Sequence, residues 1–143
     1  MSRKIVPVQP DKFVHSEKVM GLLECNFFEF LNDKQSALVM FYNPNCANCL
    51  RSRGHYARAA KFTKRDGHAY AAVDCTTETD LCKREGISRL PTYQLYSKGM
   101  YISHRDFPMD YLRMNDFIDA GFTIPQLKPN PQQDPPCTRK SKY

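Results

Sequence analysis

The sequence predicts an α/β domain in which helices cover both faces of a mixed central sheet, a three-layer α/β/α arrangement. Two runs, 37–42 and 69–73, are apolar throughout and rich in strand formers, as expected of central strands that are buried on both faces. A helical pattern separates them, and a right-handed crossover of this kind makes the two strands parallel. Two later strand candidates are joined by a hairpin turn, which makes the sheet mixed.

The N-terminal part of the chain predicts one edge strand and one helix. Residues 4–8 are β-branched and bounded by prolines, which suits an edge strand. From Ser16 to Asp33 apolar residues recur every three or four positions, and Ser16 is a suitable N-cap, so we expect a helix. Cys25 lies off the apolar stripe of this helix, which predicts a surface or boundary position.

The remaining elements complete the predicted order β-α-β-α-β-α-β-β-α. In the last predicted helix, Leu112, Phe117 and Ile118 are expected to face inward, and Gly121 ends it. The expected elements after the first central strand are helices at about 47–65, 76–85 and 109–120, and strands at 92–96 and 100–104 that flank a turn at 97–99.

The chain has the length of one domain with an attached tail. Its 143 residues carry enough apolar content to bury a core without metal or disulfides. We expect the domain at 1–122 and a Pro-rich, basic tail or linker, disordered, at 123–143, because that segment holds five of the ten prolines. No run of about 18 apolar residues exists, so no membrane partner is expected.

The net charge of +6 raises the question of a nucleic-acid partner. No aromatic platform or nucleic-acid motif accompanies the basic residues, so we interpret them as the solvated face of a helix that steers acidic partners. We therefore expect no nucleic acid to bind. The positions with the highest basic density are Arg51, Arg53, Arg58, Lys61, Lys64 and Arg65.

Two of the six cysteines, Cys46 and Cys49, lie where a buried strand gives way to a helix. Two cysteines with this spacing beside a strand-helix-strand pattern predict a dithiol redox site. Cys46 is the expected nucleophile, because unpaired N–H groups and the dipole at a helix N-terminus favour a thiolate. Cys49, one turn further, is expected to be more buried and to resolve the mixed disulfide.

A zinc site is the rival interpretation of the cysteines. Its ligands would be Cys46, Cys49, Cys75 and Cys82. The gap between the two pairs exceeds the roughly 15–20 residues that are usual, and the second pair is spaced too widely for a zinc knuckle. We therefore expect no metal and no cofactor.

Further motifs follow the two cysteines in a fixed order. The segments concerned are 38–44, 71–76, 80–82, 86–88 and 90–93. With them the sequence resembles, from about residue 4 to 120, the thioredoxin-fold catalytic domains of the protein disulfide isomerase family. It is most similar to the last redox-active domain of the isomerase A5 type, and the resemblance implies a thioredoxin fold.

The resemblance also implies a function and several site residues. Leu90 and Pro91 would bind substrate, with Pro91 in the cis form, and Cys75 and Cys82 would form a structural disulfide. The implied activity is thiol–disulfide exchange or isomerisation on cysteine-containing polypeptides in the endoplasmic reticulum lumen or another oxidising secretory compartment. We expect a monomer, which is either a whole protein or one domain of a larger chain.

Several residues depart from the family pattern around the dithiol. Asn45 replaces a tryptophan and Ala47-Asn48 replaces Gly-His, so the Cys46 thiolate lacks a neighbouring imidazolium and a weaker oxidant is expected. Met40 and Ala72 replace a buried acid and a lysine, which preserves a packed core but alters proton handling.

Other positions leave alternatives open. Met109 stands where the family has a mobile arginine, and Arg105 or Arg113 nearby is a candidate replacement. Asn48 is a candidate auxiliary hydrogen-bond donor. These departures favour an alternative function, a weakly catalytic or non-catalytic module that binds clients or partners. Cys25 and Cys137 are free, paired together or bonded to another chain.

Overall fold

A mixed six-stranded sheet organises the fold in a computed structural model that describes residues 7–63, 65–107, 109–122 and 131–137. The strands are β1 (Gln9–Pro10), β2 (Val19–Gly21), β3 (Ser36–Tyr42), β4 (His68–Asp74), β5 (Thr92–Ser97) and β6 (Met100–Arg105). The helices are α1 (Phe27–Leu31), α2 (Ala47–Lys61), α3 (Thr79–Arg84) and α4 (Tyr111–Asp119), with 3-10 turns η1 (Glu24–Asn26) and η2 (Ala120–Phe122). The spatial order is β1-β2-β4-β3-β5-β6.

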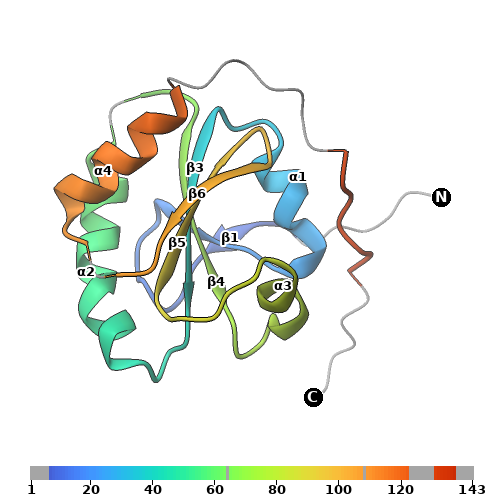
Figure 1. Ribbon diagram of the computed structural model, residues 1–143, viewed down its shortest axis with the longest axis horizontal. Coiled ribbons are helices and arrows are strands. Elements are labelled where there is room, and N and C mark those ends of the chain that lie inside the picture. Colours follow the sequence, from blue (N-terminus) through green and yellow to red (C-terminus); the bar gives the residue numbers. More distant parts are fainter. Residues whose placement is uncertain (1–6, 64, 108, 123–130, 138–143) are drawn as a thin grey trace.

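The sheet separates two hydrophobic cores. Helices α2 and α4 cover one face, and α1 and α3 cover the other (Figure 1). Because side chains alternate along a strand, Leu38 and Met40 of β3 face α2, whereas Ala37 and Val39 face α1 and α3. Strands β2, β3 and β4 are parallel, and β5 runs antiparallel to β3. These layers and the mixed sheet confirm the predicted fold class.

The segment after Ser16 is not the helix that the periodicity predicts. Val19–Gly21 forms β2, which pairs in parallel with β4, and helical structure begins only at Glu24. The Ser16 hydroxyl accepts the N–H of Lys18 and so closes a turn instead of capping a helix. The predicted helix was therefore wrong over its first turns, because pairing with a strand far along the chain overrides the local pattern.

Two smaller differences concern the ends of the domain. The strand predicted at 4–8 lies mostly outside the described residues, and the pairing edge is β1, antiparallel to β2. In α4, Met114, Phe117 and Ile118 are buried, whereas Leu112 is 59% exposed. Leu112 faces outward because it lies about 200° around the helix from Met114. None of the described helices is long and apolar enough to cross a membrane.

The described part of the tail, residues 131–137, lies beside α1 without forming a helix or strand (Figure 1). A disulfide joins Cys137 to Cys25. The Asp134 carboxylate accepts the N–H groups of Phe28 and Glu29 at 2.7 and 2.9 Å. Over these residues the structure differs from the expectation of disorder, because a covalent bond and two hydrogen bonds hold the segment. The predicted boundary at 122/123 stays a prediction.

Candidate active site

Cys46 lies at the point where β3 gives way to α2. The loop between them is closed by the Asn43 side chain, which accepts the N–H of Asn45 at 2.8 Å, and by the Asn43 carbonyl, which accepts the N–H of Cys46. Cys46 is the N-cap of α2, and its sulfur accepts the N–H of Cys49 at 3.2 Å. The sulfur therefore faces unpaired N–H groups and the positive end of the helix dipole, which both favour a thiolate.

Cys49 occupies the buried face of α2, one turn after Cys46. Its side chain is 0% exposed, whereas Cys46 is partly exposed, and both are free thiols. Burial, together with the hydrogen bond that its thiol makes with Cys46, raises the pKa of Cys49 to about 12. The structure thus pairs one accessible sulfur with one buried, protonated sulfur.

The Leu90–Pro91 segment lies next to the dithiol. The peptide bond between these residues is cis. The Cys46 sulfur is 3.6 Å from the carbonyl oxygen of Leu90, which accepts a hydrogen bond from it. Leu90 is partly buried, Pro91 is buried, and β5 begins at the next residue. The fold therefore brings together four of the residues that the sequence predicts for the site: Cys46, Cys49, Leu90 and Pro91.

Cys75 and Cys82 form a disulfide with a Cα–Cα distance of 5.8 Å. Cys75 follows β4 and Cys82 lies in α3, on the face of the sheet opposite to the two thiols. Their sulfurs are bonded to each other, so the four-cysteine zinc site considered from the sequence does not form. In the described ranges, no group of three or more His, Cys, Asp or Glu residues is arranged to hold a metal ion.

The two candidate auxiliary residues have other contacts. The Asn48 side-chain oxygen accepts a hydrogen bond from Arg51 on the exposed side of α2. Arg105, at the end of β6, donates to the Ser103 hydroxyl and to the His104 carbonyl, and its guanidinium lies 4.4 Å from the ring centroid of Phe117. Arg105 is therefore held by β6 and α4. A role of either residue in catalysis stays a prediction.

Comparison with protein families agrees with this geometry. The sequence matches the thioredoxin family over residues 18–120, from β2 to the end of α4. The chain belongs to the thioredoxin family. The match includes both thiols, the Leu90–Pro91 segment and the Cys75–Cys82 disulfide.

Among relatives of this thioredoxin-family chain are protein disulfide isomerases. Protein disulfide-isomerase A5 of Bos taurus is 36% identical over 117 residues, which are 78% of this chain and 22% of the relative. Protein disulfide-isomerase A4 of Homo sapiens is 41% identical over 93 residues, which are 64% of this chain and 14% of the relative. The resemblance to the isomerases is thereby confirmed, although the chain spans less than a quarter of either relative.

Solved structures show the same fold. The first thioredoxin domain of mouse protein disulfide-isomerase A4 has a TM-score of 0.68 at 22% identity and covers 96% of this chain and 90% of that domain. Human ERp44 in form II has a TM-score of 0.68 at 25% identity and covers 78% of this chain and 32% of that chain. The thioredoxin fold is therefore confirmed.

A buried carboxylate that was not predicted from the sequence, Asp11, bonds to Tyr42 at the end of β3 in this thioredoxin-family chain. Asp11 is 8% exposed, and one of its oxygens accepts the N–H groups of Phe13 and Val14. The other oxygen accepts the hydroxyl of Tyr42 at 2.9 Å, and the ring of Tyr42 stacks on Phe13 with 4.3 Å between centroids. These contacts anchor the segment before β2 against the end of β3. The bonds to Phe13 and Val14 are those of an ordinary turn, and the bond that ties Asp11 to the sheet could not be predicted because Tyr42 lies 31 residues away.

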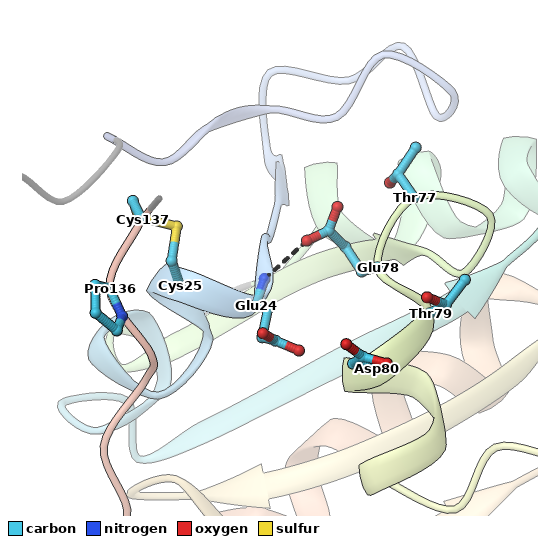
Figure 2. A pocket seen from close by; sticks show the side chains of 8 residues that line it. All are labelled: Glu24, Cys25, Thr77, Glu78, Thr79, Asp80, Pro136 and Cys137. Atoms are coloured by element: carbon cyan, nitrogen blue, oxygen red, sulfur yellow. Dashed lines mark hydrogen bonds between the residues drawn. A yellow bond between two sulfur atoms is a disulfide. The ribbon is translucent and has the colours of Figure 1, made fainter. Parts of the chain in front are cut away.

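An open pocket of about 220 Å³ lies where the tail meets η1 and α3 (Figure 2). A carboxylate oxygen of Glu78 accepts the N–H of Glu24 at 2.9 Å, and both residues line the pocket. The two cysteines in its wall are bonded to each other, so the pocket offers no free thiol. Its lining residues are Glu24, Cys25, Thr77, Glu78, Thr79, Asp80, Pro136 and Cys137.

Proposed function

We propose that the chain is a thiol–disulfide oxidoreductase domain of the isomerase type that acts on cysteine-containing polypeptides. The observation that carries the proposal is the pairing of an accessible sulfur at a helix N-terminus with a buried one. Cys46 accepts the N–H of Cys49 at 3.2 Å and lies beside the Leu90 carbonyl. The likeness to protein disulfide isomerases supports this function.

In the first step the Cys46 thiolate attacks one sulfur of a substrate disulfide. A bond forms between these two sulfurs as the substrate disulfide breaks, and the other substrate sulfur leaves with the electron pair and takes a proton from water. The N–H groups at the start of α2 hold the thiolate before the attack. Leu90 and Pro91 form the neighbouring surface on which the substrate chain lies.

In the second step the Cys49 thiol gives its proton to water and its sulfur attacks the Cys46 sulfur. The bond between Cys46 and the substrate breaks, and the second substrate sulfur leaves and is protonated. The Cys46–Cys49 pair has then lost two electrons and forms a disulfide, and the substrate has gained these electrons and carries two thiols. Because burial keeps Cys49 protonated at neutral pH, we expect this step to be the slower one.

The proposal extends to the cellular context of the domain. Two disulfides within the described residues are in keeping with an oxidising secretory compartment such as the endoplasmic reticulum lumen. The substrates are polypeptides that carry thiols or disulfides, and the domain acts as a monomer without a bound cofactor. Other domains of a larger chain are further candidate partners.

The test is the reduction of a synthetic peptide with one disulfide by the reduced protein. We expect Cys46→Ser to abolish turnover, and Cys49→Ser to accumulate a covalent adduct of protein and peptide that mass spectrometry detects. The matched control, Cys75→Ala with Cys82→Ala, removes two cysteines on the other face and should retain turnover. Turnover by Cys46→Ser, or no adduct with Cys49→Ser, would contradict the proposal.

A second candidate is a domain that binds client polypeptides with little catalysis. It is favoured by the apolar residues Met40 and Ala72, which lie opposite each other on β3 and β4 and provide no ionisable group near Cys49. In the same assay, absence of turnover by the wild-type protein together with peptide binding by Cys46→Ser would support this candidate over the enzyme.

A further inference from the structure

Tyr93 carries a buried hydroxyl that makes no hydrogen bond of normal geometry in the described part of the chain, and the Ser52 hydroxyl of α2 is the polar group beside it. The side chain is 0% exposed. A buried hydroxyl without a partner costs free energy, and a phenylalanine would fill the same space without that cost. Packing alone therefore does not explain the hydroxyl of Tyr93.

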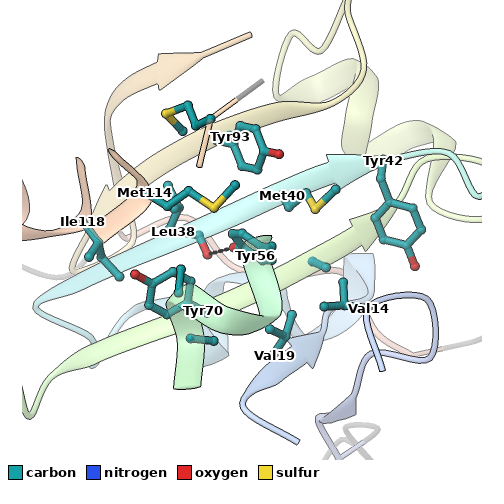
Figure 3. Packing of buried hydrophobic residues seen from close by; sticks show 14 of the residues in the cluster. Val14, Val19, Leu38, Met40, Tyr42, Tyr56, Tyr70, Tyr93, Met114 and Ile118 are labelled. Atoms are coloured by element: carbon teal, nitrogen blue, oxygen red, sulfur yellow. Dashed lines mark hydrogen bonds between the residues drawn. The ribbon is translucent and has the colours of Figure 1, made fainter. Parts of the chain in front are cut away.

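The hydroxyl belongs to the row of sheet residues that faces α2. Tyr93 on β5 lies opposite Met40 on β3, and Met40 lies opposite Ala72 on β4. All three side chains are in the core on the α2 side of the sheet, where Tyr93 lies beside Met40 (Figure 3). The ring of Tyr93 packs on Tyr56 of α2 with 5.7 Å between centroids. Met40 and Ala72 cannot donate a hydrogen bond. Arg105 on β6, the charged residue opposite Tyr93, donates to the Ser103 hydroxyl and the His104 carbonyl. The Tyr93 hydroxyl is therefore the donor of this row that is not already engaged in a hydrogen bond of normal geometry.

The helix face opposite this row carries the buried thiol. Cys49 and Ser52 are three residues apart in α2 and both are buried against the sheet. The pKa of Tyr93 is raised to about 12, chiefly by burial and also by negative charge on Cys49 or Cys46, while hydrogen bonding with the Ser52 hydroxyl lowers it. Tyr93 therefore keeps its proton at neutral pH, and it belongs to the same buried cluster as Cys49, against which Cys46 packs.

We propose that the Tyr93 hydroxyl donates a hydrogen bond to the Cys49 sulfur when that sulfur becomes a thiolate. This inference rests on the proposed function and concerns its second step. The Cys49 proton passes to water, the Cys46–Cys49 bond forms, and the substrate sulfur leaves with the electron pair and a proton from water. Rotation about the phenolic C–O bond turns the hydroxyl proton without moving the ring, so the donor is available as charge develops on Cys49.

The test separates the two steps of exchange in a single turnover. The substrate is a fluorescent peptide whose cysteine is activated as a 2-pyridyl disulfide. Release of pyridine-2-thione reports the attack by Cys46, and the later fall in fluorescence anisotropy reports release of the peptide by Cys49. Both rates are measured as a function of pH for the wild-type protein and for Tyr93→Phe.

We expect Tyr93→Phe to slow peptide release about tenfold at neutral pH and to shift its pH profile to higher pH, because a thiolate loses a hydrogen bond. The rate of the first step should not change, and the melting temperature should be equal or higher. The matched control is Tyr70→Phe, which removes another buried hydroxyl, one that donates to Asn115. It should leave both rates unchanged.

A site-specific 3-fluorotyrosine at position 93 gives an independent test that keeps the ring and the hydroxyl. Its more acidic phenol is a stronger donor, so the pH profile of peptide release should shift to lower pH. A normal release rate and an unchanged profile in both Tyr93 variants would overturn the role of Tyr93 while the proposed function stands. Failure of Cys49→Ser to trap the peptide on Cys46 would instead overturn the proposed function.

Discussion

Cys49 donates its backbone N–H to the Cys46 sulfur at 3.2 Å, while its own sulfur is fully buried. One residue thus stabilises charge on its neighbour and is shielded from carrying charge itself. Two residues separate the cysteines, so Cys49 lies in the first turn of the helix that Cys46 caps. In that turn the N–H of Cys49 points back to the N-cap, and the side chain of Cys49 points toward the sheet. The pair therefore consists of two chemically different thiols.

The buried Cys49 thiol should make the stability of the reduced protein fall at alkaline pH. Burial raises its pKa from 9.0 to about 12, so the folded state holds the proton more tightly than the unfolded state does. This contribution is complete below about pH 9 and is lost as the pH rises toward about 12. In urea titrations, the stability advantage of the wild-type protein over Cys49→Ser should shrink as the pH rises from about 9 to about 11. Other buried groups are common to both proteins, so a constant difference would contradict this prediction.

The two disulfides should contribute unequally to stability. Cys25 and Cys137 are 112 residues apart, whereas Cys75 and Cys82 are 7 apart. The chain-entropy model gives about 4–5 kcal/mol for the long loop and about 2–3 kcal/mol for the short one. Urea unfolding of the two double serine variants in the same redox buffer measures both losses. A larger loss from the variant without Cys75 and Cys82 would show that the long link does not constrain the unfolded chain as expected.

The hydrogen bonds of Asp134 should hold the tail segment against α1. Asp134→Ala leaves the N–H groups of Phe28 and Glu29 without this acceptor and removes a negative charge from a helix N-terminus. We expect a loss of about 1 kcal/mol in urea unfolding and faster proteolysis within residues 131–137 when Cys137→Ser is also present. Asp134→Asn keeps one acceptor and should lose less. Equal stability of Asp134→Ala and the wild-type protein would mean that the disulfide alone holds the segment.

Two glycines should respond to alanine in opposite directions. A Cβ at Gly121 would lie 2.5 Å from the Cβ of Ser36, a buried residue whose hydroxyl donates to the Ile118 carbonyl. Gly121→Ala should therefore cost about 1–3 kcal/mol. Gly54, within α2, has no heavy atom within 4 Å of an added Cβ, so Gly54→Ala should stabilise by about 0.5–1 kcal/mol. Thermal unfolding compares the two, and a stable Gly121→Ala would show that η2 shifts at little cost.

The sequence was sufficient where a pattern is local. Residues 37–42 of β3 and 69–73 of β4 are apolar throughout, and the turn before β6 has Lys98 and Gly99 at positive φ, as a hairpin requires. The cysteine spacing likewise predicted an accessible and a buried thiol. Each of these inferences depends only on neighbouring residues and on which residue types are favoured in a strand, a turn or a helix.

The sequence was insufficient where distant segments meet. Residues 19–21 have apolar spacing that fits a helix, and only their pairing with β4 makes them a strand. Cys25 and Cys137 had three possible states, because nothing local indicates that the tail returns to α1. Tyr93 faces the core that contains Cys49 only because of the strand register and the packing of α2 on the sheet, which no local pattern indicates.

The central sheet has a further consequence for a chain proposed to exchange disulfides in other polypeptides. Both free thiols pack on the α2 side, whereas the Cys75–Cys82 and Cys25–Cys137 bonds belong to the side of α1 and α3. A thiolate can break a disulfide only by reaching one of its sulfurs in line with the bond. The layer of buried strands therefore separates Cys46 and Cys49 from the two disulfides of the same chain.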